Sequence, residues 1–176
     1  AGVKGIMELQ QQLAALAHGK EVEIQTFQHQ IAYNLIPQIG SFDENGYSSE
    51  EMKMQNEGRK ILNSPELAVN CTCVRVPILR SHSESIMVEF EQPIDVEKAR
   101  ELLATAKGVK LVDDPKSNQY PMPLDTTDQD LVYVGRIRKD ISTQANALSF
   151  WCCGDQVRKG AATNAVQIAE LLIEEL

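Results

Sequence analysis

The sequence predicts an α+β fold, and three observations lead to this prediction. Apolar residues recur at helical spacing in some segments and alternate with polar residues in others. The two kinds of segment do not follow the strict strand–helix–strand order of a doubly wound parallel sheet. The chain has 176 residues, of which 43% are hydrophobic, so it is long enough to bury the core of one domain. We expect a single domain over residues 1–176, with about six strands and four helices.

The first elements follow from spacing and from breakers. Apolar side chains three or four residues apart predict a helix over residues 1–18, and Gly19 then ends the pattern. Alternation over residues 21–27 predicts a strand. Residues 28–46 contain Pro and Gly and predict a loop, whose apolar part, residues 31–39, we expect to be tucked inside.

A capping box marks the next helix. Ser48 and Glu51 are three residues apart, so each side chain can bind the backbone N–H of the other, which predicts a helix over residues 50–62. Two alternating segments then predict strands over residues 69–76 and 85–90, with a proline between them.

The second half of the chain continues the mixed pattern. Asp95 can cap a helix over residues 95–106, and a short strand over residues 109–112 follows. The remaining expected elements are a proline-containing excursion over residues 113–130, strands over 131–137 and 147–152, and a long final helix over 157–176.

Composition excludes several classes of function. Lys and Arg number 17 against 25 Asp and Glu, a net charge of -8, which disfavours nucleic acid as a partner. No apolar run reaches the length of a membrane span, and no signal peptide is visible, so we expect no membrane partner and a cytoplasmic location. The four cysteines lack the CxxC spacing of metal sites and are too few for a disulfide scaffold, so we expect no metal and a reducing compartment.

A few polar residues could carry chemistry. Glu50 and Lys53 share one helix face and are either an exposed ion pair or a clamp for a zwitterionic or phosphorylated ligand. Arg75 lies between two valines, where its guanidinium needs an anion such as a carboxylate. His82 is expected in a polar turn between two strands, either as a plain loop residue or as an acid/base.

Two further features have simpler readings. Cys71 and Cys73 fall on the same strand face and are expected to be core residues, because no cationic neighbour activates them. Asp155 precedes the final helix and either caps it or helps to bind a polar group there.

Five ordered segments nevertheless carry a resemblance to a known family. The chain resembles the C-terminal, substrate-binding and dimerisation half of the aspartate-β-semialdehyde dehydrogenases, over essentially all of its length. The matching segments are AGVKG (1–5), YNLIP (33–37), EEMK (50–53), CVRVP (73–77) followed by HSES (82–85), and GDQVRKGAA (154–162).

The resemblance implies an activity and a role for each residue. It implies NADPH-dependent reductive dephosphorylation of β-aspartyl phosphate to aspartate semialdehyde and phosphate, through a thioacyl intermediate on a cysteine, in lysine, threonine, methionine and isoleucine biosynthesis. Arg75 resembles the arginine that binds the substrate carboxylate, Glu50 the acid that binds its ammonium, and Lys53 the cation that meets phosphate. His82 resembles the general acid/base, and Gln156 the glutamine at the nicotinamide end of NADP.

The resemblance also implies what lies elsewhere. In the family, the glycine-rich nucleotide fingerprint and the nucleophilic cysteine precede the point that matches Ala1, so we expect this chain alone to be inactive. It implies a mixed sheet with helices on one face, similar to the C-terminal domain of glyceraldehyde-phosphate dehydrogenase, and a homodimer formed through the other sheet face, with a tetramer as an alternative. The helices over 1–18 and 156–176 are expected to contact a cofactor domain. A plant or algal source would place the enzyme in plastids.

Two alternatives remain at this point. One is an N-acetylglutamyl-phosphate reductase-like enzyme, which Glu50 disfavours because an acetylated amine needs no anion. The other is a non-catalytic dimerisation module, which four charged candidates together disfavour: Glu50, Lys53, Arg75 and His82.

Overall fold

Two units make up the chain, Ala1–Leu79 and Arg80–Leu176, in a computed structural model that describes residues 2–174. The first unit holds helix α1, Gly2–Ala17, and helix α2, Ser49–Ile61, joined and followed by irregular segments. Both helices were predicted within a residue or two of these bounds. Ser48 caps α2 through the predicted capping box with Glu51.

The core of the first unit forms between α1 and the loop that follows it. Leu9 of α1 is buried with Ile31, Ala32 and Ile36, and Phe27 packs against this cluster. The expected burial within residues 31–39 is therefore confirmed for Ile31, Ala32 and Ile36, whereas Tyr33 and Leu35 are exposed. An apolar loop can be buried here because side chains of α1 form hydrogen bonds with its backbone groups.

The predicted strand over residues 21–27 is wrong. Gln12, which is 1% exposed, donates from Nε2 to the carbonyl oxygen of Glu23 and accepts the N–H groups of Ile31 and Ala32 at Oε1. Glu8 accepts the N–H of Thr26. These side chains provide the backbone partners that a neighbouring strand would otherwise supply, so no ladder forms.

The predicted strand over residues 69–76 is also wrong. Within the described residues, this segment makes a single antiparallel bridge, between Arg75 and Ile36. The N–H of Cys73 is bound by a side chain of α2 instead of a strand. Cys71 and Cys73 are consequently half-buried and not the core residues that the alternation predicted.

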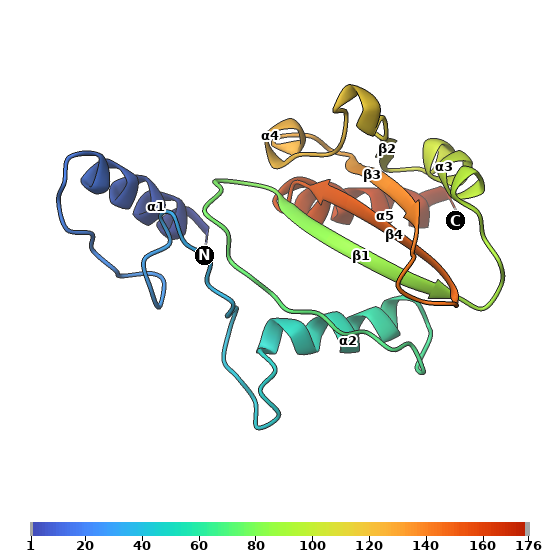
Figure 1. Ribbon diagram of the computed structural model, residues 1–176, viewed down its shortest axis with the longest axis horizontal. Helices are drawn as coiled ribbons and strands as arrows, with labels where there is room; N and C mark the ends of the chain where they lie inside the picture. Colours follow the sequence, from blue (N-terminus) through green and yellow to red (C-terminus); the bar gives the residue numbers. More distant parts are fainter. Residues whose placement is uncertain (1, 175–176) are drawn as a thin grey trace. The chain divides into compact units, whose positions relative to one another are not determined.

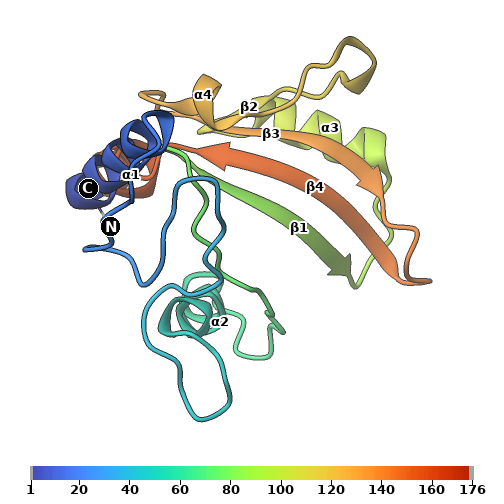
Figure 2. The same cartoon turned by 60° about the vertical axis from the view of Figure 1, so that its left-hand side comes forward.

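The second unit is built on a mixed sheet of four strands in the order β1-β4-β3-β2 (Figure 1). β1 (His82–Phe90) pairs antiparallel with β4 (Asn146–Gly154), and β4 pairs antiparallel with β3 (Val132–Lys139). β2 (Val109–Leu111) adds to β3 in parallel. Figure 2 shows the twist of these strands.

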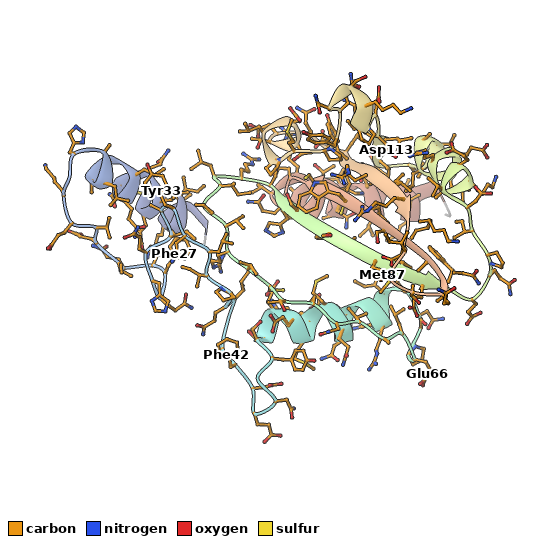
Figure 3. All side chains as sticks on the ribbon, in the orientation of Figure 1. Phe27, Tyr33, Phe42, Glu66, Met87 and Asp113 are labelled. Atoms are coloured by element: carbon orange, nitrogen blue, oxygen red, sulfur yellow. The ribbon has the colours of Figure 1, made fainter. Side chains whose placement is uncertain are left out.

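Helices cover one side of this sheet, as predicted. α3 (Val96–Thr105), capped by Asp95, buries Ala99 against Ile137 and Leu148 of the sheet. Figure 1 shows α5 (Thr163–Glu174) behind the strands, and Figure 2 shows α3 beside β3. Arg100 of α3 also pairs with Asp113 at 2.8 Å, just after β2 (Figure 3).

Glycine is required at position 135 of β3, where the backbone lies close to that of Val112. A Cβ built on Gly135 of β3 would lie 2.0 Å from the carbonyl oxygen of Val112. The ladder between β3 and β4 shifts register just after this point, between Gly135 and Arg138, where Arg136 has a φ of 56°.

The proline-containing excursion between β2 and β3 is ordered, as expected. It contains a 3-10 turn, Pro115–Ser117, and a one-turn helix, α4, Pro123–Thr126. Trp151 of β4 donates from Nε1 to the carbonyl oxygen of Pro121 at 3.0 Å, which holds the excursion against the sheet.

The final helix begins with a wider turn than predicted. A π-helical turn, Arg158–Ala162, precedes α5, and residues 175–176 of the expected helix lie outside the described residues, as does Ala1. α5 and this turn leave many apolar side chains exposed: Val157, Val166, Ile168, Leu171, Leu172 and Ile173. No helix in the part of the chain that the structure describes is long and apolar enough to cross a membrane.

Candidate active site

Glu50 and Lys53 form an ion pair in the first turns of α2. Lys53 Nζ lies 3.0 Å from Glu50 Oε2, and both side chains are substantially exposed. The hydrogen bond and the charge of Glu50 raise the pKa of Lys53 above its usual value. The structure thus brings together two of the predicted site residues, with opposite charges, at one end of a helix.

Glu51, between them, ties α2 to the segment that carries Arg75. Its Oε2 accepts the N–H of Ser48 at 2.7 Å, and its Oε1 accepts the N–H of Cys73 at 2.8 Å. These backbone hydrogen bonds, that of Ser48 first, lower the pKa of Glu51 despite its burial. The sequence predicted only the bond to Ser48, because nothing in the pattern points to a partner 22 residues away.

Arg75 is held by its backbone and leaves its guanidinium available. Its N–H and carbonyl bind the carbonyl and N–H of Ile36 at 2.9 and 3.1 Å. The guanidinium carbon lies 5.6 Å from the ring centroid of Phe27, a cation–π contact. Phe27 is labelled in Figure 3. Among residues 2–174, no carboxylate forms an ion pair with Arg75, so its fork can receive an external anion.

His82 is not in a turn, as the sequence suggested, but is the first residue of β1. It pairs with Gly154, the last residue of β4, and its side chain is exposed. The turn prediction failed because β1 begins three residues before the apolar alternation becomes visible at Ser85. Antiparallel pairing therefore places His82 beside the segment that follows β4.

Gln156 lies in that segment and is bound next to His82. Its Oε1 accepts the N–H of Ser81 at 2.7 Å. Ser81 is the residue immediately before His82, so the structure brings these two predicted site residues to the same end of the sheet. Glu50, Lys53 and Arg75 belong to the first unit, and His82 and Gln156 to the second.

Asp155 is fully buried and anchors the segment before Gln156. Oδ1 accepts the N–H groups of Val157 and Arg158, and Oδ2 accepts that of Asp128 at 2.7 Å. Arg80 Nε pairs with Oδ2 at 2.8 Å. Burial alone would raise the pKa of Asp155, but these donors outweigh burial and lower the pKa. Asp155 thus accepts N–H groups as the predicted cap would, but the N-cap residue of the π-helical turn is Val157, and the contacts to Arg80 and Asp128 were not predicted.

The cysteines are poor candidates for a nucleophile. Burial raises the pKa of Cys152 to about 12, helped by Glu84, and that of Cys73 to about 11. Burial also raises the pKa of Cys153. A reactive cysteine needs the opposite shift, because the thiolate is the nucleophile. Within residues 2–174 there is no group of three or more His, Cys, Asp or Glu side chains that could hold a metal.

Comparisons with known proteins identify close relatives. The family described as "Semialdehyde dehydrogenase, dimerisation domain" matches residues 1–159. Aspartate-semialdehyde dehydrogenase of Prochlorococcus marinus is 50% identical over 173 residues, which cover 98% of this chain and 50% of that protein. The enzyme of Aquifex aeolicus is 51% identical over 176 residues, which cover 99% of this chain and 52% of that protein. The chain thus spans about half the length of the curated relatives it matches.

Solved structures give the same result. The structure described as aspartate semialdehyde dehydrogenase II complexed with ASA, from Vibrio cholerae, superimposes with a TM-score of 0.92 at 47% identity, covering 98% of this chain and 50% of that one. The enzyme from Candida albicans, solved with NADP, superimposes with a TM-score of 0.65 at 26% identity, covering 81% of this chain and 45% of that one.

Proposed function

Because this chain belongs to the semialdehyde dehydrogenase dimerisation-domain family, we propose that it is the substrate-binding and dimerisation half of an aspartate-semialdehyde dehydrogenase. The overall reaction converts β-aspartyl phosphate, NADPH and a proton to aspartate semialdehyde, NADP and phosphate. The observation that carries this proposal is the match of nearly the whole chain, at about 50% identity, to one half of enzymes with that name.

Arg75 is proposed to bind the substrate carboxylate. A guanidinium fork gives two parallel hydrogen bonds to a carboxylate, and the bridge to Ile36 fixes the backbone that carries it. Contact with the face of Phe27 orients the guanidinium while leaving its N–H edge open to a ligand.

Glu50 and Lys53 are proposed to bind the ammonium and the phosphate. In the structure they neutralise each other across 3.0 Å. A zwitterionic acyl phosphate carries one cation and one phosphate anion, so it can replace each partner of this pair with a group of the same charge. Exchange of an exposed ion pair costs little, because such pairs contribute little to stability.

His82 is proposed to move the proton. Its exposed imidazole can accept the proton of an attacking thiol as a base and return one as an acid. The thiol itself is proposed to come from outside this chain, because burial raises the pKa of Cys73, Cys152 and Cys153 away from reactivity. We expect the 176 residues alone to be inactive for this reason.

Gln156 is proposed to contact NADP, which when bound supplies the hydride. The structure fits this role in one respect: Oε1 accepts from Ser81, so the amide nitrogen is the group left to donate to a ligand. The rest of the cofactor site is proposed to lie in a separate cofactor domain that contacts α1 and the segment from Gln156 through α5. The exposed apolar side chains of α5 support this, because burying them against such a domain is favourable.

A homodimer in the cytoplasm completes the proposal. The family is described as a dimerisation domain, and β1 leaves Met87 exposed on the sheet. A two-fold interface would bury the same residues of both copies. The bacterial relatives support a cytoplasmic location.

The test joins these 176 residues behind the N-terminal half of the Vibrio cholerae enzyme, to which this chain is 47% identical. We expect the chimera to restore growth of a bacterial strain that lacks its own aspartate-semialdehyde dehydrogenase, and to oxidise aspartate semialdehyde in the presence of phosphate and NADP. Arg75→Lys should abolish growth, and Arg138→Lys, at an exposed arginine of β3, should not. A chimera that acts only on N-acetylglutamate semialdehyde, or that dimerises without any activity, would overturn the proposal in favour of one of the two alternatives.

A further inference from the structure

Ser81 adopts a backbone conformation that L-residues avoid. Its φ is 76°, in the left-handed region, although it is not glycine, and only 4% of its surface is exposed. Such a conformation persists only where surrounding contacts enforce it, and it is enriched at functional sites. Ser81 is also the link between Arg80, which pairs with buried Asp155, and exposed His82.

Two hydrogen bonds hold Ser81 in place. The hydroxyl of Thr126, which is fully buried at the end of α4, donates to Ser81 Oγ at 2.9 Å. The N–H of Ser81 donates to Oε1 of Gln156 at 2.7 Å. The bond between Thr126 and Ser81 is buried, which makes it stronger than an exposed counterpart, and the bond to Gln156 is partly buried.

We infer that Ser81 is a positioning residue for the reaction, held by Thr126, which sets the imidazole of His82 and the carboxamide of Gln156 relative to each other. The direction of the Cα–Cβ bond at His82 depends on the backbone of Ser81, and the orientation of Gln156 depends on the N–H of Ser81. One strained residue therefore fixes two groups that come from segments far apart in the sequence. This inference rests on the proposed function.

The same contacts form a closed circuit. Thr126 binds Ser81, and Asp128, two residues on, donates its N–H to buried Asp155. Asp155 precedes Gln156, whose Oε1 accepts the N–H of Ser81 and so closes the circuit. Thr126 and Asp128 are both fixed by hydrogen bonds, and so is Gln156 at the start of the final helical segment. Ser81 therefore has little freedom to relax into a more common conformation.

The circuit also determines which hydrogen-bonding group of Gln156 can bind a ligand. An amide side chain has one acceptor oxygen and one nitrogen with two N–H donors. The N–H of Ser81 occupies the oxygen, so Gln156 meets a ligand as a donor. We expect its partner to be an acceptor atom, such as a carbonyl oxygen of the substrate or of the cofactor carboxamide.

The test uses four variants of the active chimera. Thr126→Val keeps the side-chain shape but removes the hydroxyl, and Thr126→Ser restores it. Thr127→Val is the matched control, because within residues 2–174 the hydroxyl of Thr127 bonds only to the carbonyl oxygen of Pro123. Gln156→Met removes the acceptor for the N–H of Ser81. For each variant we would measure kcat, KM for aspartate semialdehyde, and hydrogen exchange of the peptide that contains the Ser81 amide.

Thr126→Val should lower kcat roughly 10- to 100-fold, the loss expected from misplaced catalytic groups, with KM little changed because Arg75 and Glu50 are intact. Thr126→Ser should recover most of that loss, and Thr127→Val should match the unaltered chimera. Exchange of the Ser81 amide should accelerate in Thr126→Val and in Gln156→Met.

Equal kcat in Thr126→Val and the unaltered chimera would overturn the inference, as would equal losses in Thr126→Val and Thr126→Ser. Unchanged Ser81 exchange in Gln156→Met would overturn it whatever the activity. If exchange responds as expected but the unaltered chimera has no dehydrogenase activity, the proposed function fails, and the catalytic role of Ser81 fails with it.

Discussion

Glu51 and Cys73 are joined by a 2.8 Å hydrogen bond from the backbone N–H of Cys73 to Oε1 of the carboxylate. The other oxygen, Oε2, caps α2 through Ser48. One buried carboxylate therefore sets both the start of the helix that carries Glu50 and Lys53 and the segment that carries Arg75. Residues proposed to bind three parts of one substrate share a single structural support.

Two variants separate the cap hydroxyl of Ser48 from the carboxylate of Glu51. Ser48→Ala removes the hydroxyl that accepts the N–H of Glu51 and should destabilise the protein by about 1 kcal/mol, while both bonds of the Glu51 carboxylate remain. Glu51→Ala removes both bonds and should in addition speed hydrogen exchange of the Cys73 amide. Urea unfolding and exchange mass spectrometry measure the two effects. Equal Cys73 exchange in both variants would show that Glu51 does not hold the segment.

The lowered pKa of Asp140 predicts that the protein loses stability in acid. Hydrogen bonds from Ser142, and then Ser149, lower its pKa to about 2 in the turn between β3 and β4. Because the pKa is about 3.9 in an unfolded chain, ionised Asp140 stabilises the fold above about pH 4. That contribution is lost as the pH falls from about 4 to about 2.

Asp140→Asn should therefore flatten the fall in unfolding free energy over this pH range. Glu44→Gln is the control, because Glu44 is exposed and accepts no hydrogen bond from any residue in 2–174. Thermal unfolding at several pH values distinguishes them. A curve for Asp140→Asn as steep as that of the unaltered protein would contradict the prediction.

Asp155→Asn should cost about 3 kcal/mol, because it leaves Arg80 without its buried countercharge and replaces an acceptor oxygen with a donor. Asp130→Asn is the matched control. Asp130 pairs with Arg158 at an exposed position, so this variant should lose much less unfolding free energy. Urea denaturation of both variants makes the comparison. Similar losses would mean that burial of Asp155 does not matter.

Cys152 should resist alkylation at neutral pH. Burial and then the negative charge of Glu84 raise its pKa to about 12, so almost none of it is thiolate. Glu84→Gln should increase its rate of reaction with iodoacetamide and leave that of Cys73 unchanged. Mass spectrometry of labelled peptides gives both rates. Reaction of Cys152 as fast as free cysteine would argue that it can serve as a nucleophile.

Met87→Glu should dissociate the proposed homodimer. Met87 is 52% exposed on β1 (Figure 3), and a charge placed there would be buried against its own copy across a two-fold interface. Leu124→Glu, at a leucine that is 90% exposed on α4, is the control. Size exclusion with light scattering reports the mass. Two variants of identical mass would place the interface elsewhere.

Much of the fold could be predicted from the sequence. Periodicity and capping residues located α1, α2 and α3, and alternation located all four strands of the second unit. The two extra strands, over residues 21–27 and 69–76, were predicted wrongly for one shared reason. Side chains of neighbouring helices, Gln12 and Glu51 among them, take up backbone groups that alternation alone assigns to a ladder.

The site was only partly visible in the sequence. Residues of types suited to binding or catalysis, such as Arg75 and His82, could be identified in the sequence, and their roles came from the family resemblance. The supports could not be found, because Ser81 and Thr126 are 45 residues apart and both are ordinary polar residues in loop-like sequence. The position of His82 at a strand end also depends on pairing with β4, which local sequence does not specify.

The excursion between β2 and β3 also limits how the length of this protein can vary. Its second half is fixed three times, at Pro121 by Trp151, at Thr126 by Ser81 and at Asp128 by Asp155. Its tip, around the Pro115–Ser117 turn, is exposed and closes on itself through Asp114 and Gln119. Extra residues can therefore be accommodated at the tip, as in other surface turns, whereas one residue inserted between 121 and 128 would move an anchor of the site. Such a tip is the natural place for a peptide tag or a fused domain.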